Sequence, residues 1–239
     1  MKFEWDIHPE IIRLFDVLPI RYYSLLFVLG LLLGLSVVKK LWVRENWQVE
    51  ELDRLTLFVF IATIIGARLG HCLFYEPQYY WSNPLEILLP FRIENGSFEF
   101  TGFQGLASHG GILAIFIAIW IFSLRSKLSF LSILDKVSVG GALAAVFIRL
   151  GNFMNSEIIG KATNSNYGVV FKRVDTILRH PSQLYEAFAY LMIFFIVLFF
   201  YKKKQRRRDG FVFGVFFTLL FTARFVIEFF KIDLSLIHI

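Results

Sequence analysis

Long apolar runs alternate with short polar connections along most of the chain. Six runs stand out, at 22–42, 55–75, 106–124, 133–153, 184–201 and 210–230. Each has about 18–21 residues, enough for a helix to cross a hydrocarbon core of about 30 Å. Helices of this length that are apolar on every side are not expected on a soluble surface, and the alternating pattern of a membrane barrel is absent. The pattern predicts an all-α polytopic membrane protein, built as a bundle of about six transmembrane helices.

Composition supports this assignment. Of the 239 residues, 56% are hydrophobic and 18% are charged, whereas about 25% of an average soluble domain is charged. A soluble core of this size could not bury so many apolar side chains, because much of a small domain is surface. The single cysteine, Cys72, rules out an intrachain disulfide scaffold. We expect residues 1–239 to form one integral-membrane domain.

The distribution of Lys and Arg predicts the orientation of the bundle. Thirteen of these residues fall in three short connections, at 39–54, 125–136 and 202–209, and nine are spread over the other side. By the positive-inside rule, the three basic connections are cytoplasmic. The N-terminus and the loops at 76–105 and 154–183 are then extracytoplasmic.

The densest basic run, at 202–208, has two interpretations. It is a cytoplasmic anchor, or it also binds an anionic lipid headgroup, and nothing in the sequence favours the second. No aromatic or base-reading side chains accompany the run, so no nucleic-acid partner is expected.

Three arginines fall inside the predicted helices: Arg68, Arg149 and Arg224. An arginine at the bilayer centre costs about 2.5–3.5 kcal/mol on insertion scales, so these side chains should face the bundle interior, a water-filled cavity or a partner. At a rise of about 1.5 Å per residue, all three lie in the outer half of the membrane, as do His109 and Tyr23 at the starts of their spans. Five polar residues at one depth predict a cationic cavity open to the outer leaflet. Guanidinium groups there suit a phosphate or a carboxylate.

Each of these residues also has a structural interpretation. Arg224 and Glu228 are four residues apart and could simply pair on one helix face, and Arg68 could snorkel to the interface. His109 precedes two glycines, beginning with Gly110, which weaken a helix and permit the close approach of a ligand. The histidine could act as a general base or be an ordinary interfacial side chain.

Polar groups crowd the end of the fourth span. Arg149, Asn152 and Ser156 would share one face if the helix continued, and so many hydrogen-bonding groups at a helix exit favour a polar ligand over a simple cap. The segment at 179–186 leads into the fifth span, and both a structural and a functional interpretation of it are open.

Small residues repeat every four positions in two of the spans. Gly30 and Gly34 form one pair, and Gly66 and Gly70 form another. This spacing is typical of close contacts between membrane helices, so we interpret it as structural.

Several stretches together resemble a known family, the bacterial prolipoprotein diacylglyceryl transferases. The most specific is 149–160, which resembles the family motif G-R-x-G-N-F-x-N-x-E-x-x-G, with Ile148 in place of the first glycine. Further matches follow in order at 21–23, 66–70, 109–111 and 179–186, with a late R-F…E-F-F-R-like block at 224–231. The resemblance covers about residues 5–232.

The resemblance implies an enzyme of the bacterial cytoplasmic (inner) membrane. Enzymes of this family transfer the diacylglyceryl group of phosphatidylglycerol to the thiol of a lipobox cysteine in a preprolipoprotein, which forms a thioether and releases glycerol 1-phosphate. The implied partners are therefore phosphatidylglycerol, a lipobox peptide and membrane lipid, and no cofactor is implied. The active site would face the outer leaflet and the extracytoplasmic side.

The resemblance also implies roles for matching residues. The catalytic set comprises His109 as a candidate general base and Tyr23 as a positioning residue. It also includes Arg149 and Arg224, two cations that would stabilise the leaving phosphate. The substrate-binding set surrounds the lipid headgroup and comprises Arg149, Asn152, Glu157, Gly160, Arg68, Gly110 and Glu228. For Arg68 the implied role is to orient the headgroup or to support the fold.

Two departures from the family pattern are visible. Leu220 stands where the family usually has a tyrosine four residues before the late arginine, so one hydrogen bond to the headgroup would be lost. The family has a seventh span after the late block, and we expect this chain, which ends at Ile239, to lack it.

Two other functions fit parts of the pattern. A transporter or channel for an anionic solute would also use buried arginines, but no inverted repeat is visible. A metal-dependent enzyme that hydrolyses lipid phosphoesters would need clustered acidic ligands or closely spaced histidines, whereas His71, His109 and His180 are scattered. No metal site is therefore expected.

Overall fold

A computed structural model describes residues 2–14, 18–87, 91–94, 97–100, 105–164, 167–203 and 208–232. The chain divides into two compact units, a first unit of residues 1–44 and 134–239 and a second unit of residues 45–133. Each unit is considered by itself, and the single domain expected for 1–239 stays a prediction. The predicted loops at 76–105 and 154–183 and the basic connection at 202–209 lie partly outside the described residues.

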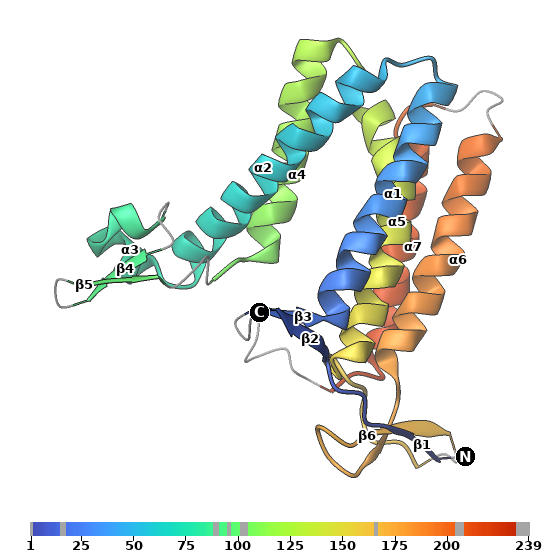
Figure 1. Ribbon diagram of the computed structural model, residues 1–239. Coiled ribbons are helices and arrows are strands. Elements are labelled where there is room, and N and C mark those ends of the chain that lie inside the picture. Colours follow the sequence, from blue (N-terminus) through green and yellow to red (C-terminus); the bar gives the residue numbers. More distant parts are fainter. Residues whose placement is uncertain are drawn as a thin grey trace. The chain divides into compact units, whose positions relative to one another are not determined.

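Within the described residues, six long helices account for the six apolar runs and confirm their places (Figure 1). They are α1 (Tyr22–Arg44), α2 (Val49–Phe74), α4 (Ser108–Ser126), α5 (Phe130–Met154), α6 (Ser182–Lys202) and α7 (Phe211–Glu228). All six are long and apolar enough to cross a membrane. The largest difference is at α2, which begins six residues before its apolar run. Glu50 and Glu51 occupy its first turn, where negative charge suits the helix N-terminus.

Short strands and a few turns of helix, which the sequence did not predict, lie in several of the other described segments. The strands are β1 (Lys2–Trp5), β2 (Glu10–Leu14), β3 (Leu18–Arg21), β4 (Phe91–Glu94), β5 (Ser97–Phe100), β6 (Gly168–Phe171) and β7 (Leu178–Arg179), and the short helices are α3 (Pro77–Ser82) and η1 (Pro84–Ile87). In the first unit, β6 pairs in parallel with β1 and antiparallel with β7. Among the other described strands, β2 pairs antiparallel with β3, and β4 pairs antiparallel with β5.

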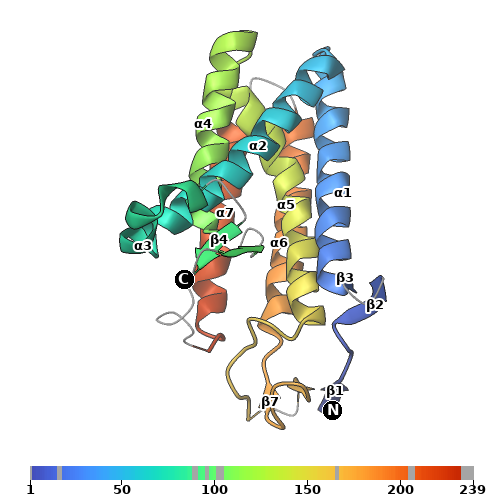
Figure 2. The ribbon, with the colours of Figure 1, turned by 60° about the vertical axis from the view of Figure 1, so that its left-hand side comes forward.

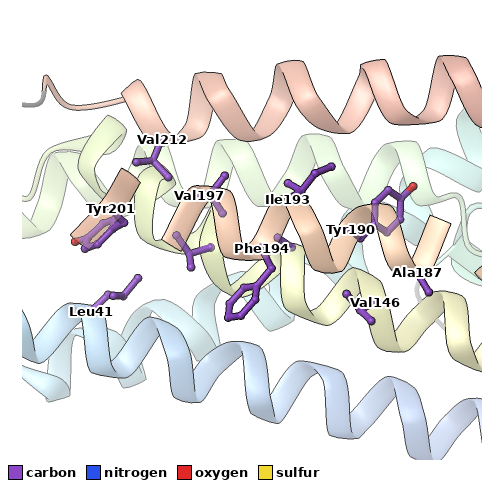
Figure 3. Close-up of a cluster of buried hydrophobic side chains, with 11 residues drawn as sticks. Leu41, Val146, Ala187, Tyr190, Ile193, Phe194, Val197, Tyr201 and Val212 are labelled. Carbon is purple, nitrogen blue, oxygen red and sulfur yellow. The ribbon is translucent and has the colours of Figure 1, made fainter. Parts of the chain in front are cut away.

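Four helices, α1, α5, α6 and α7, run side by side in the first unit (Figures 1 and 2). Their apolar core is centred on one face of α6, and its buried members include Leu41, Val146, Ala187, Tyr190, Ile193, Phe194, Val197, Tyr201 and Val212 (Figure 3). The residues of α6 recur at intervals of three and four, which is the spacing of one helix face.

Glycines bring helices together in both units, as their spacing predicted. In the first unit, a Cβ atom on Gly34 of α1 would lie 2.7 Å from the carbonyl oxygen of Gly140 in α5. In the second unit, a Cβ atom on Gly110 of α4 would lie 2.2 Å from the carbonyl oxygen of Gly66 in α2 and 2.8 Å from Cα of Gly70. Any larger residue at these contacts would separate the helices.

Polar contacts fix one end of the first unit. Asp135, near the start of α5, accepts the backbone N–H of Gly210 at 3.1 Å and that of Phe213 at 2.8 Å, at the start of α7. Lys136, which the charge count had placed in a connection, lies inside α5, fully buried, over the ring of Tyr201. The starts of α5 and α7 thus meet the end of α6, as alternating spans require.

Candidate active site

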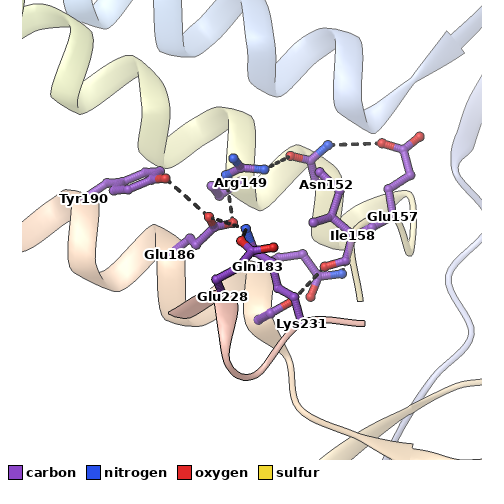
Figure 4. A network of polar contacts seen from close by, with 10 residues as sticks. Arg149, Asn152, Glu157, Ile158, Gln183, Glu186, Tyr190, Glu228 and Lys231 are labelled. Atoms are coloured by element: carbon purple, nitrogen blue, oxygen red, sulfur yellow. Dashed lines mark hydrogen bonds and ion pairs between the residues drawn. The ribbon is translucent and has the colours of Figure 1, made fainter. Parts of the chain in front are cut away.

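The opposite end of the first unit carries Arg149, near the end of α5. Its Nε lies 3.0 Å from Oε2 of Glu186, which is on α6, and its Nη1 donates to Oδ1 of Asn152 at 3.3 Å. The predicted neighbours Arg149 and Asn152 therefore do meet. The Arg149 side chain is 13% exposed and that of Glu186 is completely buried, so the pair lies inside the protein with one edge accessible (Figure 4).

Glu186 joins two cations. Its Oε1 lies 3.0 Å from Nζ of Lys231 and accepts the hydroxyl of Tyr190 at 3.3 Å. The contact of Oε2 with Arg149 is an ion pair rather than an aligned hydrogen bond, because no donor in the described part of the chain meets that oxygen with hydrogen-bond geometry. Lys231 also lies 3.3 Å from Oε2 of Glu228. A buried carboxylate needs such partners, since an unpaired charge inside a protein costs several kcal/mol.

A tight turn follows the end of α5. The helix ends at Met154, so the expected single face carrying Arg149, Asn152 and Ser156 is wrong beyond Asn152. Ser156 and Ile158 have positive φ values of 56° and 54°, a conformation that strains non-glycine residues, β-branched ones most of all. Glu157 is held between two amides, accepting from Nδ2 of Asn152 at 3.1 Å and from Nδ2 of Asn155 at 3.0 Å.

The segment at 179–186 fastens this strained turn. The hydroxyl of Ser182 donates to the carbonyl of Ile158 at 2.7 Å, and Nε2 of Gln183 donates to the carbonyl of Glu157. The backbone N–H of Gly160 donates to the carbonyl of His180 at 3.0 Å. These contacts support the structural interpretation for this segment, except at Glu186, which belongs to the Arg149 network.

Several buried polar atoms of the turn have no hydrogen-bond partner among the described residues. They are Oδ1 of Asn155, Oγ of Ser156 and Oε1 of Gln183. Buried polar groups nearly always find partners in a functional protein. The turn therefore offers donors and acceptors to a polar ligand or to water, as the helix-exit pattern suggested.

Tyr23 and Arg224 belong to the same end of the first unit. Tyr23, in the first turn of α1, lies against Gly151, where an added Cβ atom would be 2.9 Å from its ring. Arg224 is exposed on α7, and within the described part of the chain it forms no ion pair with Glu228, which binds Lys231 instead. The interpretation of Arg224 and Glu228 as a simple pair is therefore wrong, and the Arg224 guanidinium is available to a ligand.

In the second unit, Arg68 is a structural anchor. It is buried on α2, donates to the carbonyl of Glu86 at 2.7 Å and to that of Ile87 at 3.1 Å, and lies over the ring of Tyr80. Arg68 therefore does not snorkel. It ties the segment after α3 to the end of α2.

His109 and Gly110 also lie in the second unit, in the first turn of α4. The His109 side chain is exposed and makes no hydrogen bond with any described residue, which leaves both ring nitrogens accessible. Gly110 packs against α2, so helix contact accounts for it. The remaining predicted site residues, Tyr23 among them, all lie in the first unit.

An apolar cavity of about 510 Å³ lies between α6 and α7, and two of its lining residues precede Glu186 and Lys231 in the sequence. Its lining comprises His180, Leu184, Tyr185, Phe188, Ile227 and Phe230. Nδ1 of His180 lies 3.1 Å from the hydroxyl of Tyr185, so one polar pair accompanies an otherwise apolar lining. Such a cavity suits a hydrocarbon chain.

The Asp175–Arg179 pair braces the loop beside the site. The Arg179 guanidinium hydrogen-bonds the carboxyl of Asp175 and so holds the pKa of that carboxyl below its usual value. The same guanidinium donates to the carbonyl of Gly160 at 3.3 Å. Sequence reasoning attached no role to this pair.

Sequence reasoning also missed that Tyr190 and Lys231 belong to the network, and it missed the role of Glu186. Tyr190 lies one helical turn after Glu186, and Lys231 lies three residues after Glu228. These intervals place side chains on one helix face and were the available signal. Nothing in the sequence indicated that Glu186 would join α5 to the end of α7.

Comparison with known proteins assigns the family. The sequence profile of the prolipoprotein diacylglyceryl transferases matches residues 9–239. A phosphatidylglycerol–prolipoprotein diacylglyceryl transferase of Tolumonas auensis is 44% identical over 228 residues, covering 95% of this chain and 84% of that protein. Proteins of the same name from Bacteroides fragilis and Rickettsia bellii are 41% identical over 233 residues and 35% identical over 218 residues, covering 97% and 90% of this chain and 84% and 79% of their own lengths. The chain belongs to the prolipoprotein diacylglyceryl transferase family and is a multi-pass membrane transferase of bacterial lipoprotein maturation.

Proposed function

We propose that this chain transfers the diacylglyceryl group of phosphatidylglycerol to the thiol of a prolipoprotein cysteine. A carbon–sulfur bond forms at the glycerol carbon that bears the phosphate, the carbon–oxygen bond to the phosphate breaks, and glycerol 1-phosphate leaves. The substrates are those named for its relatives. The observation that carries the proposal is Arg149, a cation held inside the protein beside a polar turn with unpaired donors and acceptors.

The cations of the first unit would serve the leaving group. The phosphodiester becomes a phosphomonoester as the bond breaks, so negative charge accumulates on its oxygens. Arg149 and Arg224 would stabilise that charge, and the stabilisation is strongest where water is excluded. Asn152 and Glu157, bonded to each other beside Arg149, would bind the glycerol hydroxyls of the headgroup.

The substrate thiol must lose its proton, because the thiolate is the nucleophile. His109 is our candidate for the base, since an imidazole can accept a proton and this ring has no competing hydrogen bond within the described chain. Tyr23 would position the thiol or the headgroup. The proton passes from sulfur to the imidazole and then to solvent, so the reaction is balanced without a cofactor.

The remaining predicted residues would act through structure. Arg68 orders the segment after α3, Gly110 permits the contact of α2 with α4, and Gly160 permits the turn beside the site. Glu228 would act through Lys231. Direct contact of these four residues with the headgroup stays a prediction.

The apolar cavity between α6 and α7 would take an acyl chain of the same lipid. Two pairs of successive residues, Tyr185 with Glu186 and Phe230 with Lys231, join the cavity to the polar network. A phosphate bound at the network would therefore place a lipid chain beside the cavity. We infer that the site opens to the outer leaflet of the bacterial cytoplasmic membrane.

The test uses the purified chain in phosphatidylglycerol-containing micelles with a lipobox peptide. Mass spectrometry should detect the thioether-linked diacylglyceryl peptide and glycerol 1-phosphate, and a peptide with serine in place of cysteine should stay unmodified. Flux of an anionic solute in proteoliposomes without any thioether would favour a transporter. Activity that needs an added divalent metal would favour a lipid phosphoesterase, and either result would overturn the proposal.

A further inference from the structure

Glu186 has no part in the roles proposed above, although it is the centre of the polar network (Figure 4). It is completely buried, with Lys231 at 3.0 Å on one oxygen and Arg149 at 3.0 Å on the other. The two cations are themselves only 8% and 13% exposed. One carboxylate thus joins helices α5 and α6 to the residues after α7.

We propose that Glu186 is a positioning residue for Arg149, and that Lys231 sets the positive charge of the anion site they form together. The ligand of this site is the phosphate of the lipid substrate, so the inference rests on the proposed function and deepens it.

The positioning part follows from the contacts of the guanidinium. Glu186 lies beside Arg149 at Nε and Asn152 accepts from its Nη1, and the Tyr190 ring is a third neighbour of the guanidinium. Neighbours at different nitrogens hold the guanidinium between α5 and α6. The accessible edge of the guanidinium is thereby held in place for a ligand oxygen. Outer partners that orient a binding group in this way typically change activity by about 10–100-fold when removed.

The charge part follows from counting the buried groups. Arg149 and Lys231 contribute two positive charges and Glu186 one negative charge, so the three carry a net charge of +1. Glu228 also contacts Lys231, but its side chain is 54% exposed, and water screens its charge. Without Lys231 the carboxylate would neutralise Arg149. Lys231 therefore preserves an unbalanced positive charge for a phosphate.

Four chains test this by changing the net charge one unit at a time. It is +1 in the wild type, zero in Lys231→Met, +2 in Glu186→Gln and +1 again in the double variant. We measure kcat and KM for phosphatidylglycerol in mixed micelles with a fixed lipobox peptide. Lys231→Met should raise KM about tenfold, which corresponds to about 1.4 kcal/mol, and Lys231→Arg should restore it.

Glu186→Gln should behave differently and lower kcat about 10–100-fold without raising KM. The positive charge that binds the phosphate remains, but the Arg149 guanidinium is no longer held in one orientation. The double variant should recover the wild-type KM and keep the low kcat. Lys172→Met removes a cation from an exposed ion pair with Glu4 and should change neither constant. A purely structural role predicts no such separation of KM from kcat.

Folding is checked for each variant by monodispersity and thermal unfolding in detergent. If Glu186→Gln does not fold, Glu186→Asp serves instead, since it keeps the charge and shortens the reach to Arg149; kcat should fall with KM unchanged. A wild-type KM in folded Lys231→Met, or wild-type kcat in folded Glu186→Asp, overturns the inference. Absence of thioether from the wild type itself would instead overturn the proposed function.

Discussion

A Cβ atom on Gly160 would lie 2.3 Å from the carbonyl oxygen of His180. That oxygen accepts the backbone N–H of Gly160, and a second carbonyl, from Phe230, would lie 2.8 Å from the added atom. The third near atom is Cβ of His180 at 2.7 Å, which is fixed to the backbone, so no flexible side-chain end can move aside. Glycine is required here because two other segments approach it closely.

Replacing Gly160 with alanine should therefore destabilise the protein by about 1–3 kcal/mol, the usual cost of overpacking. Activity should fall with it, because the turn that carries Glu157 would shift. Thermal unfolding in detergent and the thioether assay measure the two effects. Gly141→Ala on α5 is the matched control, since its added Cβ atom meets nothing within 4 Å; equal losses in both variants would contradict this account.

Arg149→Lys keeps the charge but removes the planar fork. A lysine has one nitrogen and cannot bind Glu186, Asn152 and a phosphate in fixed directions at once. We expect kcat/KM to fall about 10²-fold, a loss of about 2.7 kcal/mol of transition-state stabilisation. Arg13→Lys, in an exposed pair with Glu10, should leave kcat/KM unchanged. Similar values for both variants would exclude a directional role for Arg149.

Gly110→Ala separates two roles of this glycine. The added methyl group would lie 2.2 Å from the carbonyl oxygen of Gly66, so helix contact predicts a loss of about 1–3 kcal/mol in the free energy of unfolding. A glycine that only admits a ligand would instead lose activity with its stability intact. Thermal unfolding of the variant in detergent distinguishes these results.

Acid should loosen the loop beside the site through Asp175. Arg179 holds the pKa of the Asp175 carboxyl below its ordinary value, so the folded state favours the charged form. The resulting stability is present above the ordinary pKa and is lost as the pH falls through the lowered one. Limited proteolysis of the loop should therefore quicken in acid for the wild type. In Asp175→Asn, proteolysis of the loop should be fast already at neutral pH. If the variant showed the same pH profile as the wild type, the Asp175 carboxyl would not be the group that stabilises the loop.

The six helices could be predicted because each is specified locally. An apolar run of membrane-spanning length can be recognised from its own sequence. The four-residue interval between Gly66 and Gly70 also indicated where another helix would approach. The start of α2 was misplaced because its first turn is polar. Glu50 and Glu51 stabilise a helix end that hydropathy cannot detect.

The strands could not be predicted because pairing decides them. β1 is four residues long and pairs with β6, so that Trp5 lies opposite Phe171. Neither segment is long enough to show an alternating pattern. Their structure depends on a contact between distant parts of the chain.

The candidate site was half predictable for a similar reason. The cost of burying a guanidinium identified Arg149 from residue type alone, and its interval to Asn152 placed them together. The ion-pair partner of Glu228 was not predictable, because Arg224 and Lys231 both lie within about one helical turn of it. The structure shows that Glu228 pairs with Lys231.

The carboxylate of Asp135 has a consequence for how the protein is made. It accepts two backbone N–H groups at the start of α7 from a position 75 residues or more earlier in the chain. Lipid offers these groups no acceptor. During synthesis, α5 is inserted long before α7 emerges, so the earlier helix already holds the acceptor that the later one needs. The order of translation thereby matches the order of assembly, and a chain with Asp135→Leu would leave two donors at the start of α7 unsatisfied.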